Sequence, residues 1–570
     1  MKTQAEPNLT ARQVDFSIPY FEPIVLGLIA IFYYYLRSHF FEIPMERDEG
    51  IYAYYGQLAM EGKTPYLDFY ESRLPGIFYM YGILIAIFGS FKGLAVGITI
   101  LNVGSFLFLY YFAKSWFDEH RPTAFAVASA ALLLGLAPEI SGFTRQSEHI
   151  VVFWATGTLF FLQKALLNNN WKFLLLAGVF SCLAMLTKPN GIFFIVLGGL
   201  LVVLYYAQKP QIEGDSENRF KNIIVKGLIY SAGVFGIFGL MCLHMWLKGA
   251  LADMFYWAVT FSGQYATRIP WTGENGQLGG QDYFMFALKA ATKNYLYFWL
   301  IAGLGLVLSF FVKNEKNNWY KKIGLLLIAI FSFLTITPSF SFYGHYWLML
   351  VPALALCFGA AFYAVFKLSH SNNMVAWVMA ITPAFLLIIN ITTLNKYYFT
   401  ARKDIPKVVA GTYGGNPFNE AYEMGKYIKA RAKPNDQLIL IGSEPQLLIY
   451  TGLKSATRHA YFSYLMQDST MLNIKTWQQE FEQDIINKKP RFIVFFNHDI
   501  SILANPKANF AWLNNLLTTV IPPLYKPIGY VDLLGTQQVN YVLDENKAAI
   551  YQPVQIPNQR TYFAIIFELK

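Results

Sequence analysis

A polar, charge-dense segment between two long apolar runs carries the residues best suited to chemistry. It covers residues 43–76 and reads IPMERDEGIYAYYGQLAMEGKTPYLDFYESRLPG. A helix is predicted from Asp48 onward, because the run lacks proline, is rich in helix formers and ends near Gly62. Asp48, Tyr52 and Tyr55 share one face of that helix. A carboxylate held in this way can act as a general base.

Other candidate residues stand at the edges of apolar runs. Glu49 directly follows Asp48, and Glu71 and Arg73 lie just before the point where apolar sequence resumes. Charges beside apolar spans are costly unless they are paired or hydrated, so each is a functional candidate. The later residues of this kind are Arg145, Glu148, Lys188, His345 and, as an adjacent aromatic, Tyr346.

Each candidate also has a structural explanation. Asp48 could be the N-cap of its helix, which is worth about 1 kcal/mol. Arg145 and Glu148 are three residues apart and could form an ion pair with each other. Lys188 could extend its amine to the membrane surface from a helix end, and Tyr346 could belong to an interfacial aromatic belt.

The composition is that of a polytopic membrane protein. Of 570 residues, 55% are hydrophobic, 18% are aromatic and only 14% are charged, which is too apolar for a soluble protein of this length. The net charge of +10 arises from Lys and Arg in short loops, which is the positive-inside pattern rather than a nucleic-acid-binding surface. The three cysteines, Cys182, Cys242 and Cys357, all lie in apolar runs. They offer neither a disulfide framework nor a clustered zinc site.

Eleven apolar runs are predicted to span the membrane, at about 17 to 25 residues each. They cover residues 22–41, 92–113, 122–138, 149–167, 171–187, 191–207, 226–247, 295–312, 323–338, 345–366 and 374–394. Residues 75–89 are apolar but short and begin at a proline, so we expect them to enter only the membrane interface. This arrangement gathers most Lys and Arg into the loops of one side, which is therefore the cytoplasmic side.

The fold class that follows is an all-α polytopic membrane domain with a small α/β domain after it. Residues 1–21 are expected to be a cytoplasmic tail, residues 22–394 the membrane domain with a first outer loop at 42–91, and residues 395–570 an extracytoplasmic domain. The strands predicted in one sheet of that last domain cover residues 437–441, 491–496, 525–533, 540–543 and 562–569, and helix-like segments lie between several of them.

The candidate residues all fall on the outer side in this topology. Their convergence there would create a site with carboxylates, cations and aromatic rings at the membrane boundary. Carboxylates and aromatic faces suit a sugar, whereas Arg and Lys neutralise a phosphate. Such a site suits a sugar carried on a lipid phosphate, whose tail the surrounding spans would accept.

The order of short motifs along residues 20–395 is more specific than any one of them. An acidic pair precedes a Tyr-rich helix, which is followed by GxxPYxDFxExxxPG, by a cation and an acid in the next outer loop, by an LTKP turn and by HYxxxxxPALAL. In this order the motifs resemble the polytopic glycosyltransferases of the C-type fold. These are the relatives of protein O-mannosyltransferases and of the bacterial aminoarabinose lipid A transferase.

The resemblance implies an activity and roles for individual residues. A sugar would move from a polyprenyl-phosphate-linked donor to an envelope lipid, glycan or protein on the outer face of the inner (plasma) membrane, with inversion at the anomeric carbon. Asp48 corresponds to the family's catalytic base. Arg73 stands where the family usually has a Lys, and Glu148 where it often has an Asp. These departures leave open which donor head group binds and whether a divalent metal is held.

The remaining candidates would complete the site. Cations at Arg73, Lys188 and Arg145 would stabilise the departing phosphate. Glu49 is expected to be catalytic together with Asp48. Glu49, Glu71 and Glu148 would also position sugar hydroxyls or the cations. The substrate-contacting residues expected beside them are Tyr52, Tyr55, His345 and Tyr346.

Two functions of other classes remain open at this point. A transporter or flippase of lipid-linked sugars would also place charges among spans, but transporters often show internal repeats and broken helices near the middle of the membrane. A non-catalytic protein of envelope assembly, with the C-terminal domain as its working part, is the other alternative.

Overall fold

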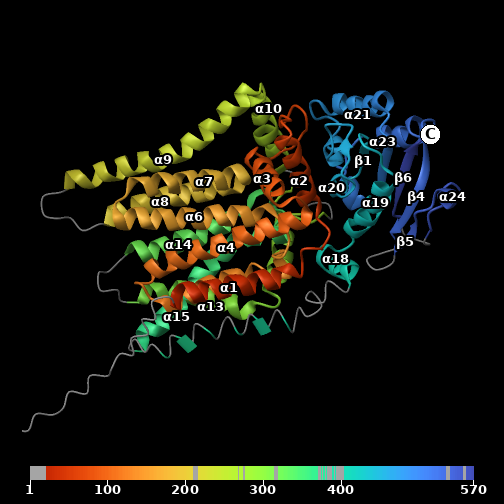
Figure 1. Cartoon of the computed structure of the whole chain (residues 1–570). Coiled ribbons are helices and arrows are strands. Elements are labelled where there is room, and N and C mark those ends of the chain that lie inside the picture. Colours follow the sequence, from red (N-terminus) through yellow and green to blue (C-terminus); the bar gives the residue numbers. More distant parts are fainter. Residues whose placement is uncertain are drawn as a thin grey trace, which may run out of the picture.

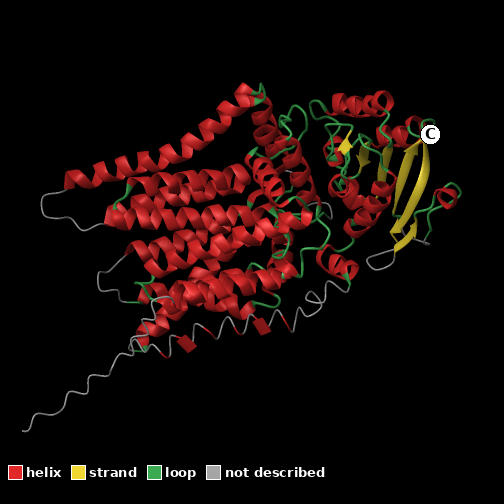
Figure 2. Ribbon diagram, viewed as in Figure 1, coloured by secondary structure: helices red, strands yellow, loops and turns green. Residues whose placement is uncertain are grey.

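The computed structural model describes residues 21–208, 216–266, 269–273, 277–312, 319–369, 404–533, 539–555 and 560–570, together with isolated positions between 374 and 392. A bundle of long helices forms one side of the molecule, and helices around a sheet form the other (Figure 2). The predicted cytoplasmic tail and most of the predicted span at 374–394 lie outside the described residues.

Long apolar helices occupy ten of the predicted membrane-spanning runs. They are α1 (Phe21–Ser38), α4 (Phe91–Trp116), α5 (Arg121–Leu134), α6 (Ser147–Asn168), α7 (Trp171–Thr187), α8 (Ile192–Gln208), α9 (Ser216–Leu247), α13 (Leu296–Phe311), α14 (Trp319–Leu334) and α15 (Val351–Leu368). By length and apolarity, six described helices could cross a membrane, or up to seven if the bent pair α12 (Gly280–Thr292) and α13 forms one span. The number of eleven spans is therefore not confirmed, but the chain is a multi-pass membrane protein.

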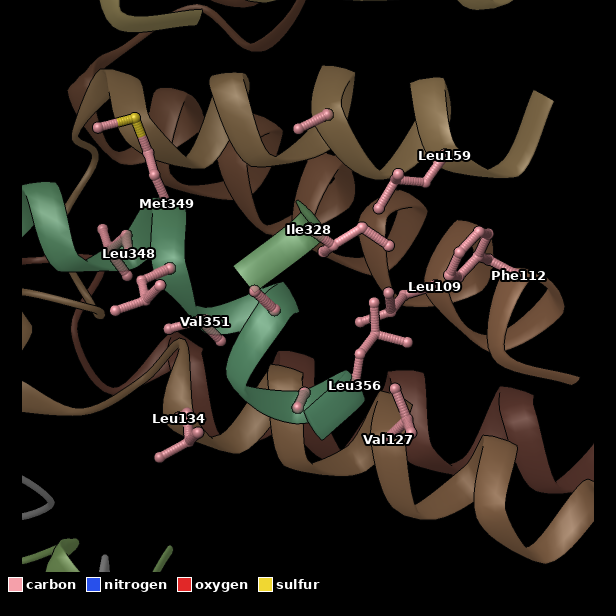
Figure 3. Packing of buried hydrophobic residues seen from close by; sticks show 14 of the residues in the cluster. Leu109, Phe112, Val127, Leu134, Leu159, Ile328, Leu348, Met349, Val351 and Leu356 are labelled. Carbon is pink, nitrogen blue, oxygen red and sulfur yellow. The ribbon is translucent and has the colours of Figure 1, made fainter. Parts of the chain in front are cut away.

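The bundle is built from apolar contacts on its inside and exposes apolar side chains on its outside. Leu109, Val127 and Leu356 come from three different helices and meet in one buried cluster (Figure 3). On α9, in contrast, Leu228 is 64% exposed and Phe235 is 70% exposed. Apolar residues exposed along a whole helix are unfavourable in water and favourable against lipid.

Two shorter helices lie across the end of the bundle that faces the C-terminal domain (Figure 1). These are α2 (Arg47–Met60) and α3 (Gly76–Phe88). They pack closely, since a Cβ atom on Gly56 would lie 2.5 Å from the backbone nitrogen of Gly82. At about 1.5 Å per residue, α3 is about 20 Å long, which is shorter than the apolar core of a bilayer.

Short helical segments connect these elements. Beside the membrane helices they are η1 (Pro138–Ile140), η2 (Pro189–Gly191), α10 (Leu251–Phe255), the π-helix η3 (Tyr256–Phe261), α11 (Ser262–Ala266), η4 (Pro338–Phe340) and η5 (Gly344–Leu350). In the C-terminal domain they are α18 (Ile405–Tyr413), α19 (Phe418–Arg431), α20 (Gln446–Thr451), η7 (Phe462–Met466), α21 (Ile474–Lys488), α22 (Asp499–Ile502), α23 (Phe510–Asn515), η8 (Leu516–Val520) and α24 (Glu545–Ala548).

The C-terminal domain contains one six-stranded sheet in the order β2-β1-β3-β6-β4-β5. Its strands are β1 (Gln437–Ile441), β2 (Lys454–Ser455), β3 (Phe492–Asn497), β4 (Tyr525–Leu533), β5 (Val539–Val542) and β6 (Phe563–Leu569). β1 pairs in parallel with β2 and β3, and β6 is antiparallel to both β3 and β4. The five strands predicted from the sequence are confirmed. β2 was not predicted, because a strand of two residues is too short to show alternating apolar and polar side chains.

Candidate active site

Helix α2 begins with Glu46 as its N-cap, whereas the sequence suggested Asp48 for that role. Glu46 is the N-cap, since its carboxylate accepts a hydrogen bond from the Asp48 backbone N–H at 2.9 Å. The carboxylate of Glu49 accepts in return from the Glu46 backbone N–H at 3.4 Å, which completes a capping box. The alternative that Asp48 caps the helix is therefore wrong. Burial raises the pKa of Glu46 to about 8, and the nearby Asp48 adds to this rise.

Asp48 itself has a side chain that no described residue engages. It lies in the first turn of α2 and is half-buried. Among the described residues, none donates a hydrogen bond to its carboxylate or forms an ion pair with it. The carboxylate nevertheless interacts electrostatically with Arg73, Lys188 and His345. It is thus a partly exposed acid within electrostatic range of Arg73, Lys188 and His345.

The adjacent Glu49 is fully buried and is paired with Arg145. Its carboxylate accepts hydrogen bonds from the Arg145 backbone N–H at 2.6 Å and from the guanidinium at 3.4 Å. The same guanidinium donates to the carbonyls of Phe41, Ile43 and Phe91. Burial raises the pKa of Glu49, and Arg145 opposes this rise. These two residues therefore join helix α2 to the segments around Phe41, Phe91 and Arg145.

A second buried carboxylate, Glu148, holds the cation of the LTKP turn. Its Oε1 atom forms a close ion pair with the Lys188 amine and lies 3.8 Å from Nε2 of His345. The Lys188 amine also lies 4.0 Å from the centre of the Tyr346 ring. The sequence alternative in which Arg145 and Glu148 pair with each other is wrong, because each has a different partner.

The first-loop pair Glu71 and Arg73 is joined to the C-terminal domain. The Glu71 carboxylate accepts a hydrogen bond from the Tyr464 hydroxyl at 2.5 Å and lies 3.9 Å from the Arg73 guanidinium. Ser72 lies between them and accepts a hydrogen bond from Arg73 at 2.6 Å. Burial raises the pKa of Glu71, and Arg73 opposes this rise. The side chain of Arg73 keeps 21% of its surface exposed, so it can reach a ligand.

The two predicted tyrosines of α2 differ in their surroundings. Tyr55 stacks on Phe69 at 4.3 Å between ring centres and donates its hydroxyl to the carbonyl of Tyr70 at 3.1 Å. It therefore shapes the loop. Tyr52 lies edge to face with Tyr81 at 5.6 Å and interacts electrostatically with Arg73. Tyr52 is thus the tyrosine of α2 that borders the charged cluster.

The structure therefore brings Asp48, Arg73, Lys188 and His345 into one cluster where α2, the first loop and the bundle meet. We call these four residues the charged cluster. Tyr52, Glu71, Glu148 and Tyr346 border it, whereas Glu49, Arg145 and Tyr55 serve to hold its framework.

Sequence reasoning missed the contacts that come from the C-terminal domain. Tyr464, Glu444 and Asn416 all contact residues of the segment 42–91, although they lie several hundred positions away. No local sequence pattern marks these three residues, except that Glu444 directly precedes Pro445 in the turn after β1. A cavity of about 910 Å³ also lies in the C-terminal domain and has Asn416 in its wall. The site is therefore identified by its charges and not by cavity size.

Within the described ranges, no three His, Cys, Asp or Glu side chains are grouped so that they could hold a metal ion. The divalent metal that the sequence leaves open thus has no ligand set among these residues. The groups available for chemistry are carboxylates, cations and tyrosines.

Comparison with known proteins places this geometry in context. Residues 72–211 match the family model described as dolichyl-phosphate-mannose-protein mannosyltransferase. No curated protein sequence matches the chain significantly. The crystal structure of ArnT from Cupriavidus metallidurans bound to undecaprenyl phosphate is 13% identical, with a TM-score of 0.56 over 96% of this chain and 98% of that chain. The same protein in the apo state gives a TM-score of 0.54 at 13% identity over 96% and 97% of the two chains.

A further solved structure is that of the oligosaccharyltransferase of Archaeoglobus fulgidus. It is 13% identical, with a TM-score of 0.49 over 93% of this chain and 75% of that chain. The match to ArnT and the match to the mannosyltransferase family model confirm the resemblance inferred from the sequence. This chain shares its fold with ArnT, and residues 72–211 are similar to the mannosyltransferase family.

Proposed function

We propose that this protein is a membrane glycosyltransferase that moves a sugar from a polyprenyl-phosphate-linked donor to an acceptor hydroxyl. One observation carries the proposal. The Asp48 carboxylate accepts no hydrogen bond from a described residue and interacts electrostatically with the cations Arg73 and Lys188. The support from comparison is the shared fold with ArnT, whose structure contains undecaprenyl phosphate.

The reaction is a single in-line displacement with inversion at the anomeric carbon. Asp48 accepts the proton of the acceptor hydroxyl, whose oxygen forms a new bond to that carbon. The bond between the carbon and the phosphate oxygen breaks, and its electron pair leaves with the lipid phosphate. A well-placed general base of this kind is typically worth about 10² to 10⁴ in rate.

The cations stabilise the negative charge that grows on the departing phosphate. Arg73 contributes a partly exposed guanidinium, whose planar fork matches two phosphate oxygens. Lys188 contributes an amine that Glu148 and the Tyr346 ring hold in place. Preorganised charges act strongly here because the site is largely removed from water.

The aromatic and acidic neighbours border the sugar site. The rings of Tyr52 and Tyr346 are buried beside the cations, and the buried carboxylates of Glu71 and Glu148 hold Arg73 and Lys188 in place. The acceptor in this proposal is an envelope lipid, glycan or protein on the outer face of the inner membrane, where the C-terminal domain also lies. That placement rests on the distribution of Lys and Arg in the loops.

The experiment that tests the proposal has two parts. The full chain, purified into lipid nanodiscs, is supplied with polyprenyl-phosphate sugars, and consumption of each donor is measured by mass spectrometry. Envelope lipids, glycans and glycoproteins of cells with and without the gene are compared in parallel. We expect one donor to be consumed and one envelope component to lose a sugar in the absence of the gene. If no donor is consumed, and the chain reconstituted in sealed vesicles instead moves intact donor across their membrane, the proposal is overturned in favour of a flippase.

A further inference from the structure

Arg47, the residue before Asp48, is directed into the C-terminal domain. Its guanidinium donates hydrogen bonds to the carbonyl of Ile500 at 2.7 Å and to the side-chain oxygen of Asn416 at 2.5 Å. It also lies 3.9 Å from the carboxylate of Glu444, which is fully buried. One side chain at the start of α2 thus contacts three separate segments of that domain.

Glu444 is itself fixed from the opposite side. Its carboxylate accepts a hydrogen bond from the Ser501 hydroxyl at 2.6 Å. The guanidinium of Arg47 further lies 5.4 Å from the centre of the Phe418 ring. A planar, multiply bonded guanidinium in a site of this kind has one orientation, so the backbone of the first turn of α2 is held with it.

A second link of the same kind lies next to Arg73. The hydroxyl of Tyr464 contacts Glu71 at 2.5 Å and the hydroxyl of Ser72 at 2.9 Å. Ser72 in turn accepts a hydrogen bond from the Arg73 guanidinium at 2.6 Å. Tyr464 is packed against Trp257 and is buried, so the domain also determines where this cation stands.

The interface of α2 with the C-terminal domain is also closely packed away from Arg47 and Tyr464. A Cβ atom on Gly50 would lie 2.5 Å from the Cβ and backbone nitrogen atoms of Gln446. The Met45 backbone N–H donates to the hydroxyl of Tyr450 at 2.5 Å. Helix α2 therefore cannot tilt relative to the C-terminal domain without breaking several contacts at once.

We propose that the C-terminal domain positions both reacting groups, through Arg47 for the base Asp48 and through Tyr464 for the cation Arg73. Arg47 and Tyr464 are positioning residues, because each acts through its neighbour in the first outer loop. The domain thereby sets the distance between the proton acceptor and the phosphate-binding cation. This inference rests on the proposed glycosyl transfer.

The test compares three variants of the full chain in the transfer assay. Arg47→Met is combined with Glu444→Gln, so that no buried charge is left unpaired. Tyr464→Phe removes one hydroxyl and keeps the ring. The matched control is Lys454→Met, which breaks an exposed ion pair between the same domain and Glu61 of the same loop.

The expected result is a loss of turnover without a loss of donor binding. The Arg47→Met/Glu444→Gln variant should lower kcat by about 10- to 100-fold, since a displacement on the order of 1 Å costs about 100-fold. Tyr464→Phe should lower kcat by about tenfold. Both should keep KM for the donor within about twofold, because the missing interaction acts in the transition state.

Two checks make the outcome decisive. Arg47→Lys keeps the charge but loses the fork, and it should recover part of the kcat of the Arg47→Met/Glu444→Gln variant. If that variant does not fold, Arg47→Lys and Tyr464→Phe must still lower kcat below the Lys454→Met control. Variants that match the control in kcat would overturn the inference while the parental protein still transfers sugar. A parental protein that transfers no sugar would instead overturn the proposed function.

Discussion

Replacement of Asp48 by Asn separates a catalytic carboxylate from a structural one. Asp48 is not the helix cap, because Glu46 fills that role, and no described donor or cation bonds to its carboxylate. The change therefore removes no hydrogen bond, only the electrostatic interactions of a partly exposed negative charge with Arg73, Lys188 and His345 and with the N-terminal end of the helix dipole. The dipole interaction is worth about 0.3 to 1 kcal/mol, so Asp48→Asn should unfold within about 1 kcal/mol of the parental protein.

The expected effect on turnover is much larger. Loss of a general base lowers the rate by about 10² to 10⁴, which raises the barrier by about 2.7 to 5.5 kcal/mol at 1.36 kcal/mol per tenfold. Because the base acts in the transition state, KM for the lipid donor should change little. The effect on rate thus exceeds the effect on stability several-fold, and the two can be told apart.

The assay measures transfer from the donor by the purified full chain, with thermal unfolding recorded on the same samples. Glu46→Ala is the control, since it removes the cap and should cost about 1 kcal/mol of stability while the Asp48 carboxylate remains. A fully active Asp48→Asn protein would refute the reasoning. The base would then lie outside α2, because the neighbouring Glu49 is already buried against Arg145.

The other predictions concern the cations, one buried acid and the membrane orientation. Arg73→Ala should lower kcat for transfer from the donor, and Arg73→Lys should recover part of it; unchanged kinetics would remove Arg73 from the phosphate site. Lys188→Ala should lower the free energy of unfolding by about 3 to 5 kcal/mol, because the Glu148 carboxylate would stay buried without its partner. A melting temperature equal to that of the parental protein would contradict this prediction. Burial raises the pKa of Glu444 to about 7, so the folded protein keeps a proton that the unfolded chain releases above about pH 4.5. The free energy of unfolding should then fall by about 3 kcal/mol as the pH rises from about 4.5 to about 7, and Glu444→Gln should abolish this slope in pH-dependent melting. The membrane orientation is tested with cysteines at the exposed positions Lys63 and Asn168. In cells with a permeable outer layer, an impermeant thiol reagent should label the cysteine at 63 and not the one at 168. Labelling at 168 alone would reverse the topology.

Local patterns in the sequence determined the elements. The helices at 91–116 and 147–168 and the strands at 437–441 and 525–533 were predicted close to their observed bounds, because apolar length and alternation are properties of neighbouring residues. The number of spans could not be obtained in this way. Helices such as α5 and α7 are apolar but only 14 and 17 residues long, and hydropathy alone does not say how such segments meet the bilayer.

The candidate residues were likewise visible as charges at the edges of apolar runs, but their roles were not. Arg145 lies three residues from Glu148 in the sequence and is nevertheless paired with Glu49. Glu148 is paired with Lys188 instead.

Tertiary packing alone decided which carboxylates are paired and which is available for chemistry. A buried charge is costly unless it is paired with an opposite charge. Which opposite charge lies close enough depends on how the helices pack, and therefore on the whole fold. Asp48 remains available because the neighbouring Glu46 and Glu49 take up the cap and the ion pair of its helix. The anchoring of its loop by Tyr464, from a domain hundreds of residues away, could not be read from any local pattern.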